Sequence, residues 1–355
     1  MIWNRRSAPY KNAITNELFI TASVGMYLHF PGDNNTSPFA LGGVRQTGLE
    51  PVVSHDDKYL KAAIDGYDWL KNSNMTNAQG LYVDGYHIRH WRRNGTKCNE
   101  RNEMVYTYNQ GVLLSGLRGL WEGTGNRTYL DDGHELARNT IIATGWSLDD
   151  QKNVTCPGKW AGMGRDGILE DRCDALGSCS QDSQTFKGIF FHHLSLLCEP
   201  LPLKARVPGT THKVDRALAS LHGDRCQSYA LWIAHNGKAA LKTRDRDGKF
   251  GTWWGARYDA DVQPLTDGAI DYRNNVSELL GPLWYPEAET WAFAVSQMPM
   301  PDFAEPHGDV QALASIPEVI NAEFDWNDRG RGRTVETQGG GVSVLSALWK
   351  IVNMT

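Results

Sequence analysis

The segment that most constrains the fold runs from residue 106 to residue 121 and reads YTYNQGVLLSGLRGLW. In its second half, apolar residues fall at i, i+1, i+4, i+7 and i+8: Leu113, Leu114, Leu117, Leu120 and Trp121. This spacing puts them on one stripe of an α-helix and predicts a helix with one buried face. The first half is polar and aromatic, and it lies where the chain enters that helix and backbone N–H groups lack partners.

The polar start of this helix, with Tyr108, Asn109 and Gln110, suits the binding of a sugar. Aromatic rings offer an apolar face for stacking, and amide side chains offer paired donors and acceptors for hydroxyl groups. A helix cap without any ligand explains the same residues equally well. Both interpretations stay open at this point.

Helical patterns recur along the chain, at residues 9–30, 56–70, 126–142, from 186 onward, 213–235 and 337–352. Together with the segment at 106–121 they predict about seven helices. We find no convincing run of alternating strands, so the sequence predicts an all-α fold. The phrases DDKYLKAAIDGYDWL and NRTYLDDGHELARNTII each follow another helix across a loop. This weak repetition of a helical hairpin is typical of stacked or ring-closed αα units.

Cysteines and glycosylation signals indicate an oxidising, extracellular environment. The six cysteines fit three disulfides, and Cys173 and Cys179 bracket a short polar loop that makes them the best candidate pair. Asn-x-Ser/Thr sequons begin at eight positions, where chance would give roughly two or three. They are Asn34, Asn35, Asn74, Asn94, Asn126, Asn153, Asn275 and Asn353. The first residues, MIWNRR, lack the apolar core of a secretory signal, so the chain reads as one whose front is missing.

Charge and composition exclude several classes of protein. A net charge of -5 argues against a nucleic-acid binder. No apolar run approaches the roughly 18 residues of a membrane span. The cysteines and histidines show no zinc-ligand spacing, and we expect neither a metal nor a cofactor.

Five phrases, in this order, resemble glycoside hydrolase family 76, the endo-α-1,6-mannanases, and its fungal members in particular. They are YKNAITNELF (10–19), YVDG (82–85), YTYNQGVLLSGL (106–117), the DGILED to FKGIF run (166–190) and TQ…VLSAL (337–348). The resemblance implies an (α/α)6 toroid of twelve helices, whose inner-helix ends line a glycan groove. It implies one domain over residues 1–355 that lacks its first helices, with residues 256–332 as an insertion.

The resemblance also implies where the chemistry lies. Retaining glycoside hydrolysis needs two carboxyl groups about 5–5.5 Å apart. Family members carry them as an adjacent Asp-Asp followed by tryptophan, well before the YKN phrase, so we expect that pair upstream of Met1 and assign no catalytic residue here. The pairs Asp56-Asp57, Asp131-Asp132 and Asp149-Asp150 are not followed by tryptophan. We interpret the first two as helix-start residues and the third as part of a loop.

Substrate-binding residues are carried over from the matching phrases. They are Asn12, Asn16, Glu17, Asp84, Tyr108, Asn109, Gln110, Phe186, Lys187 and Gln338. Each has a structural alternative: a cap, a turn residue, a solvated lysine or a core side chain. Trp253 and Trp254 fit sugar stacking and core packing equally, and His192 and His193 fit helix packing better than catalysis.

The leading hypothesis is a secreted or cell-wall, glycosylated, monomeric mannan endo-1,6-α-mannosidase with a retaining mechanism, or a transglycosylase of the same family. Its partner is α-1,6-mannan or another mannose-containing cell-wall glycan. One alternative is a noncatalytic glycan-binding member that lacks the Asp-Asp pair. Another is an all-α secreted protein without a ligand. If the leading helices are missing, we expect apolar flanks to be exposed on the helices at 10–30 and 337–352.

Overall fold

The computed structural model describes residues 9–33, 52–88, 90, 94–149, 154–155, 157–257 and 325–354. All of them belong to one of two units of the chain, Met1–Ile270 with Asp325–Thr355. The other unit, Asp271–Phe324, lies outside the described residues, as does most of the predicted insertion at 256–332.

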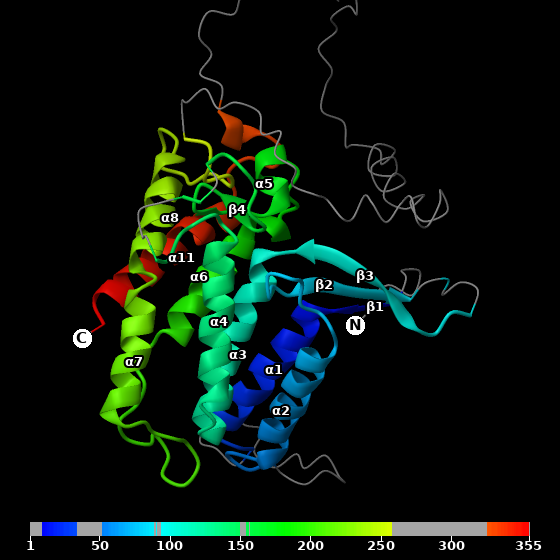
Figure 1. Cartoon of the computed structure of the whole chain (residues 1–355), viewed down its shortest axis with the longest axis vertical. Helices are drawn as coiled ribbons and strands as arrows, with labels where there is room; N and C mark the ends of the chain where they lie inside the picture. Colours follow the sequence, from blue (N-terminus) through cyan, green and yellow to red (C-terminus); the bar gives the residue numbers. More distant parts are fainter. Residues whose placement is uncertain are drawn as a thin grey trace, which may run out of the picture. The chain divides into compact units, whose positions relative to one another are not determined.

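An inner layer of helices pack side by side in a row (Figure 1). The helices of this layer are α1 (Ala13–His29), α3 (Thr107–Thr124), α6 (Phe186–Leu197) and α11 (Val335–Val352). Helix α3 contacts α1 on one side and α6 on the other, and α6 also contacts α11. The predicted stripe on α3 is confirmed, because its five apolar residues are at most 1% exposed.

Outer helices cover this row. They are α2 (Asp57–Asn72), α4 (Thr128–Ile142), α7 (Arg216–Gln227) and α8 (Ala230–Lys242). Helix α2 packs on α1 and α4 packs on α3, so the two helical hairpins expected from the repeated phrases are confirmed. Helix α8 packs on α11. The prediction of a single helix at 213–235 is wrong, because two helices, α7 and α8, lie there. Between them the backbone makes a tighter, 3₁₀-type turn, in which the N–H of Tyr229 donates to the carbonyl of Cys226, three residues earlier.

Close packing within the inner row depends on glycine. A Cβ added to Gly111 on α3 would lie 2.5 Å from the backbone Cα of Phe190 on α6. On another face of α3, a Cβ at Gly119 would lie 2.7 Å from a methyl group of Val24 on α1. Only a residue without a side chain allows these helices to approach so closely.

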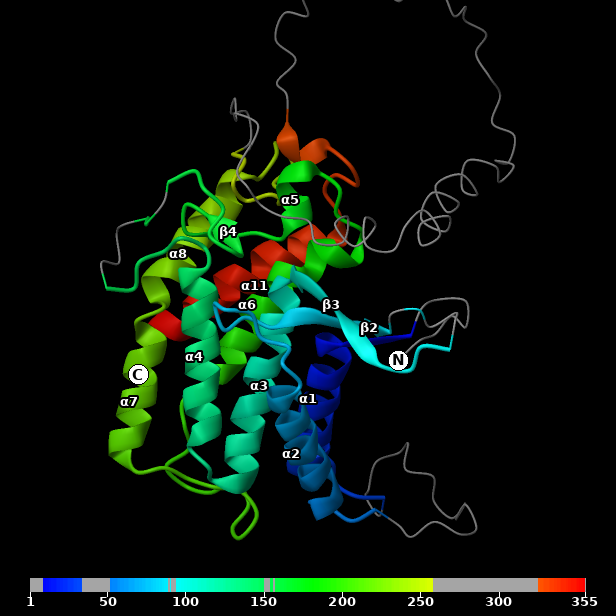
Figure 2. The same ribbon diagram turned by 45° about the vertical axis from the view of Figure 1, so that its right-hand side comes forward.

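A small antiparallel sheet lies at the end of the bundle where α1 and α3 begin (Figure 2). Its strands are β1 (Tyr10–Asn12), β2 (Val83–Ile88) and β3 (Cys98–Val105), paired in that order, with Tyr10 opposite His87. The prediction of a fold without strands is therefore wrong in this detail. The buried, inward positions on β3 are Glu100, Asn102 and Met104. Because two of these three residues are polar, the sequence lacks the apolar–polar alternation that marks a strand.

Shorter elements complete the described part of the fold. Strands β4 (Gly164–Arg165) and β5 (Ile168–Leu169) form a second sheet, followed by α5 (Arg172–Leu176) and the 3₁₀ turns η2 (Asp182–Thr185) and η3 (Trp326–Asp328). Trp253 and Trp254 are 2% and 3% exposed, which places both in the core. No helix in the described part is both long and apolar enough to span a bilayer.

The predicted Cys173–Cys179 disulfide is confirmed, and a second disulfide joins Cys198 to Cys226. Cys98 carries a free, exposed thiol, and Cys156 lies outside the described residues.

Helices α1 and α11 stand at the two edges of the row and carry exposed apolar side chains, as expected. Leu18 and Phe19 on α1 are 52% and 53% exposed, and Val342 and Trp349 on α11 are 61% and 68% exposed.

Candidate functional site

Three aromatic rings meet where α3 and α6 begin. The centroid of the Tyr108 ring lies 3.9 Å from that of Phe186, and Tyr106 lies 5.7 Å from Tyr108 and 5.6 Å from Phe186. All three side chains are half-buried, so each keeps some exposed surface. The structure thus brings together Tyr108 and Phe186, which belong to different phrases of the sequence.

A hydrogen-bonded group formed by the three strands includes the predicted residue Asp84. The hydroxyl of Tyr10 donates to Asp84 Oδ2, and Asn102 Nδ2 donates to both the Tyr10 hydroxyl (3.1 Å) and Asp84 Oδ2 (3.3 Å). The Tyr10 ring stacks on His87 at 4.1 Å. Burial, and then the negative charge of Asp84, raise the pKa of Tyr10, so the hydroxyl stays protonated and acts as the donor.

Glu17 on α1 lies close to this group but is fully buried. Neither of its carboxyl oxygens has a hydrogen-bond partner among the described residues. Burial raises the pKa of Glu17 well above its ordinary value, and the charge of Asp84 raises it further. Burial without a hydrogen-bond partner therefore favours the neutral form of this carboxyl group. Burial followed by Asp84 also raises the pKa of Tyr108, and Glu17 contributes, so Tyr108 lies near both carboxyl groups.

Asn109 and Gln110 are both fully buried, although the sequence predicted them to contact a ligand. Gln110 accepts a hydrogen bond from the N–H of Tyr82 (2.8 Å) and donates to the carbonyls of Tyr82 (2.9 Å) and Tyr106 (3.0 Å). It therefore joins the start of α3 to the residue before β2. Neither polar atom of Asn109 has a partner in the part of the chain described.

Lys187 belongs to a buried chain of polar contacts rather than to the surface. Its ammonium group pairs with Asp174, and Asp174 accepts a hydrogen bond from the N–H of Asp171 (3.0 Å). Asp171 in turn accepts from the N–H (2.9 Å) and the hydroxyl (2.7 Å) of Thr107. Burial, together with the charge of Asp174, raises the pKa of Asp171 to about 7. These contacts tie the Cys173–Cys179 loop to the starts of α3 and α6.

Glu170 is also buried beside this chain of contacts. Its carboxylate lies 3.3 Å from a guanidinium nitrogen of Arg165. Burial raises the pKa of Glu170 to about 8, although the charge of Arg165 opposes that rise. A buried carboxyl group with so weak an acidity is mostly protonated at pH 7.

The other predicted binding residues have structural contacts. Asn12 caps α1 by accepting from the N–H of Thr15 (3.3 Å), and Asn16 donates to the carbonyl of Asn12 (2.7 Å). Gln338 accepts from the N–H of Phe250 (3.0 Å). These three residues are half-buried and retain some exposed surface.

The histidines on α6 behave as surface and packing residues. His192 is exposed, and the ring of His193 lies 2.7 Å from the hydroxyl of Ser115 on α3.

Three aspartates of the Asp-Asp pairs make structural contacts. Asp56 caps α2 by accepting from the N–H of Lys58 (3.0 Å). Asp131 pairs with Arg225 at 2.6 Å, and Asp132 accepts from Tyr67 (2.7 Å) and from Lys71. The structural interpretation of these two pairs is confirmed. Asp150 lies outside the described residues, so the third pair is not tested.

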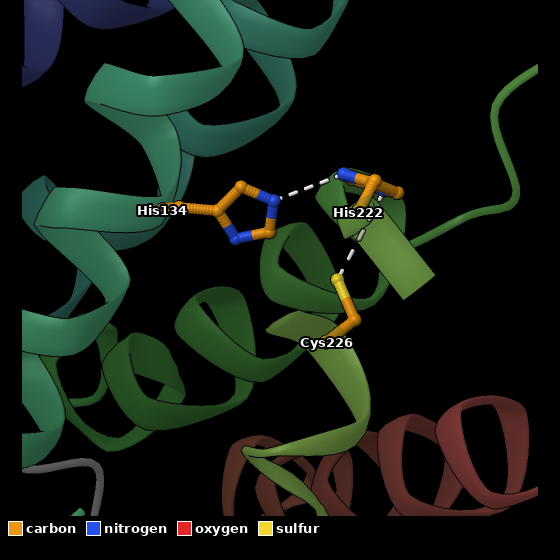
Figure 3. Close-up of side chains that lie close together, drawn as sticks. All are labelled: His134, His222 and Cys226. Carbon is orange, nitrogen blue, oxygen red and sulfur yellow. Dashed lines mark hydrogen bonds between the residues drawn. The ribbon is translucent and has the colours of Figure 1, made fainter. Parts of the chain in front are cut away.

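Two groups bring three potential metal ligands within 4.8 Å of one another in the described part of the chain. They are His134 with His222 and Cys226 (Figure 3), and Cys173 with Asp174 and Cys179. Every cysteine in these groups is part of a disulfide, so no thiolate is available to bind a metal.

Sequence reasoning missed Tyr10, Asn102, Asp171 and Asp174. Tyr10, Asp171 and Asp174 lie inside phrases that were recognised, so their position was a usable signal. Asn102 lies on a strand that was not predicted, and it carried no such signal. The contact between Asp171 and Thr107 joins residues 64 positions apart, which a single sequence does not reveal.

Comparison with known proteins shows the family. A sequence profile of Glycosyl hydrolase family 76 matches residues 49–241, more than half of the chain. Mannan endo-1,6-alpha-mannosidase DFG5 of Saccharomyces cerevisiae is 28% identical over 142 residues, which are 39% of this chain and 26% of that protein. Mannan endo-1,6-alpha-mannosidase DCW1 of the same yeast is 24% identical over 204 residues, or 57% of this chain and 34% of that protein. The chain thus spans only about a quarter to a third of these relatives.

Solved structures with a similar fold include Dfg5 from Chaetomium thermophilum in complex with glucosamine. It is 17% identical with a TM-score of 0.43, and the match covers 69% of this chain and 44% of that one. An inactive variant of the alpha-1,6-mannanase GH76A of Salegentibacter sp. HEL1_6, in complex with alpha-1,6-mannotriose, is 18% identical with a TM-score of 0.45. That match covers 72% of this chain and 55% of that one. From the profile match, this chain belongs to glycosyl hydrolase family 76, and its described helices form part of that family's (α/α)6 toroid.

Proposed function

We propose that this chain acts on α-1,6-linked mannan as a glycoside hydrolase of the mannan endo-1,6-α-mannosidase type. Membership of family 76, and similarity to two yeast proteins named as mannan endo-1,6-alpha-mannosidases, support this proposal. The observation that carries it is the half-buried aromatic and carboxylate surface formed by Tyr108, Phe186 and Asp84 at the starts of the inner helices.

This surface has the chemistry that a mannose unit needs. The rings of Tyr108 and Phe186 offer apolar faces for the C–H groups of a sugar, and Asp84 offers a charged acceptor for hydroxyl groups. Gln110 and Lys187 are buried, and in this proposal they position the surface without touching the glycan. Asn12, Asn16 and Gln338 keep exposed surface and add hydrogen-bonding groups along the same inner helices.

The chemical step is retaining hydrolysis through two carboxyl groups about 5–5.5 Å apart. Family members carry these groups as adjacent aspartates before the YKN phrase, and residues 1–9 contain no aspartate. This proposal therefore assigns glycan contacts, and no catalytic carboxyl group, to the described residues. Transfer to a sugar hydroxyl uses the same covalent intermediate, so a transglycosylase is compatible with the same site.

A noncatalytic glycan-binding protein is the second candidate function, and one observation favours it. The carboxyl groups near the aromatic rings are either fully buried, as Glu17 and Asp171 are, or hydrogen-bonded to Tyr10, as Asp84 is. Such a site binds mannan without cleaving it.

The test combines binding and cleavage on one substrate. We would measure affinity for α-1,6-mannotetraose and the release of reducing ends from α-1,6-mannan, for the wild type and for Tyr108→Ala. The control is Tyr59→Ala, because Tyr59 lies on the outer helix α2. We expect Tyr108→Ala to weaken binding about 10-fold or more, since one stacked ring contributes about 1–3 kcal/mol. Equal affinities of the two variants would refute the proposed surface, and binding without cleavage would favour the second candidate.

Secretion and N-glycosylation belong to the same proposal. The sequon residues Asn74, Asn94, Asn126 and Asn353 are all exposed, so an oligosaccharyltransferase has access to each. Treatment of the protein, expressed through a secretory pathway, with an N-glycan-releasing amidase should lower its mass. An unchanged mass contradicts this part of the proposal.

A further inference from the structure

A pocket of about 450 Å³ lies between the outer helix α4 and the junction of α7 and α8, and it shares no residue with the aromatic surface. Every residue that lines it carries a polar group, and no aliphatic side chain contributes. The lining residues are Arg127, Asp131, His134, Glu135, Arg138, Arg225, Ser228 and Tyr229. The volume falls within the range of small-molecule sites, and the polar lining suits a hydrated ligand.

Positive charge exceeds negative charge in this pocket, with three guanidinium groups against two carboxylates. Arg225 pairs with Asp131 at 2.6 Å and Arg127 pairs with the same carboxylate at 3.2 Å. One negative charge is therefore shared by two guanidinium groups. Each guanidinium carries five N–H donors, so both retain donors that the carboxylate does not use.

Arg138 is the guanidinium group that is not committed to a partner. Within the described residues it makes no ion pair or hydrogen bond, and its side chain is exposed on α4. Its charge still acts on the base of the pocket. Burial lowers the pKa of His134 and raises that of Tyr229, and Arg138 and Arg225 act on the pKa of both groups. Arg138 and Arg225 therefore lie close to the same buried pair of side chains.

The base of the pocket is buried, hydrogen-bonded and uncharged. His134 Nδ1 lies 2.9 Å from the Tyr229 hydroxyl, and His134 Nε2 lies 2.9 Å from His222 Nδ1 (Figure 3). His222 lies next to Cys226, which the disulfide with Cys198 fixes in place. Burial, followed by the neighbouring His222, lowers the pKa of His134 to about 3, so the imidazole is neutral at pH 7. Attraction for an anion comes from the arginines and not from the histidines.

We propose that this pocket binds an oxyanion, a phosphate or a carboxylate, carried by a sugar-sized molecule, with Arg138 and Arg225 as its ligands. Guanidinium groups match the geometry of phosphate and carboxylate oxygens through pairs of parallel hydrogen bonds. The pocket is larger than a free anion requires, and its polar walls, including Glu135 and Ser228, offer groups for hydroxyls. The site is separate from the surface proposed to bind mannan.

The test uses the full chain and calorimetric titration with inorganic phosphate, mannose 6-phosphate and glucuronic acid, with neutral mannose as the comparison ligand. The variant is Arg138→Ala, which removes an exposed side chain without a structural partner. The matched control is Arg216→Ala, because Arg216 is exposed on α7 and does not line the pocket. Thermal melting of each variant verifies that the fold is retained.

We expect at least one of the three anions to bind saturably and more tightly than mannose. The affinity should fall at least 10-fold in Arg138→Ala, stay unchanged in Arg216→Ala and weaken with added salt. Tightest binding of mannose 6-phosphate identifies the ligand as a phosphate-bearing sugar, and tightest binding of glucuronic acid identifies it as a carboxylate-bearing sugar. If inorganic phosphate binds as tightly as either, the sugar-sized ligand is overturned. Absence of saturable binding, or the same affinity in Arg138→Ala and Arg216→Ala, overturns the proposal.

Discussion

Asp171 accepts two hydrogen bonds from Thr107, one from its backbone N–H at 2.9 Å and one from its hydroxyl at 2.7 Å. Thr107 is the first residue of α3, where N–H groups have no partner within the helix. Asp171 thus satisfies one of these groups from a segment 64 residues away. The carboxyl group of Asp171 also lies at the N-terminus of α3, which is the positive end of the helix dipole. The position of Tyr108, the next residue, depends on it.

Replacing Thr107 with valine should test this contact. The variant keeps the shape of the side chain but leaves one buried oxygen of Asp171 without its hydroxyl donor, which costs about 1–3 kcal/mol. Thr107→Ser, the control, keeps the hydroxyl and loses only a methyl group. Urea unfolding should show a larger loss for the valine variant than for the serine variant. The reverse order would show that Thr107 contributes mainly through packing.

Glu170 makes stability depend on pH in a definite direction. Its pKa is about 8 in the folded protein against 4.5 for the free group, so the folded state binds more protons between these values. The free energy of unfolding contributed by Glu170 therefore decreases as pH rises from about 4.5 to about 8. In Glu170→Gln this decrease should be smaller. Parallel stability–pH curves for the wild type and the variant, from urea unfolding at several pH values, would contradict this prediction.

Gly111→Ala should destabilise the protein, because the added Cβ would lie 2.5 Å from the backbone of Phe190. Backbone on two packed helices cannot yield as a side chain can, and we expect a cost of about 1–3 kcal/mol or more. Gly25→Ala is the matched control. No atom lies within 4 Å of the added Cβ at Gly25 in α1, so alanine should stabilise the helix by about 0.5–1 kcal/mol. Thermal melts of both variants measure the difference, and equal shifts would refute the packing argument.

The two disulfides should differ in their contributions to stability. Cys173 and Cys179 are 6 residues apart, whereas Cys198 and Cys226 are 28 apart. Loop-closure entropy gives about 2 kcal/mol for the shorter loop and about 3.5 kcal/mol for the longer one. Replacing both cysteines of each pair with alanine, in separate variants, should therefore lower stability more for Cys198–Cys226. Equal losses in urea unfolding would show that chain entropy does not decide the difference.

The side-chain amide of Asn109 is buried and has no hydrogen-bond partner among the described residues. The variant Asn109→Leu tests whether this amide only fills the core or also binds the glycan. If Asn109 only fills the core, leucine of similar size should leave stability unchanged or raise it, because no hydrogen bond is lost. If a bound glycan opens the site and bonds to the amide, affinity for α-1,6-mannotetraose should fall by about 10-fold while the melting temperature holds. We expect the first result, because the Asn109 side chain is fully buried. A lower affinity at an unchanged melting temperature would instead assign the amide to the glycan.

The inner helices could be predicted from the sequence because their apolar residues repeat at a helical period, as Leu113, Leu117 and Leu120 do. The Cys173–Cys179 disulfide was also predictable, because a short loop brings its ends together. Strand β3 was not, because burial of Glu100 and Asn102 on its inward face removes the alternation that marks a strand.

At the candidate site, the sequence predicted which kinds of side chain are present better than it predicted which of them reach the surface. The phrase with Tyr108, Asn109 and Gln110 contains the groups that sugars need, but consecutive helical residues point about 100° apart. Tyr108 keeps exposed surface, whereas Asn109 and Gln110 are fully buried. Contacts such as Lys187 with Asp174 depend on how a loop folds over the helix starts, and no local pattern records that arrangement.

The backbone N–H of Tyr82 donates a hydrogen bond to the side chain of Gln110. The rate at which this amide hydrogen exchanges with solvent therefore reports on the start of α3. The N–H of Tyr82 donates to a side chain of that helix and not to a neighbouring strand. It is released to solvent only when the helix start opens or moves, so its exchange rate follows the opening of α3. A glycan that settles on Tyr108 and Phe186 and holds this end of the helix closed would slow exchange at Tyr82, a residue it never touches.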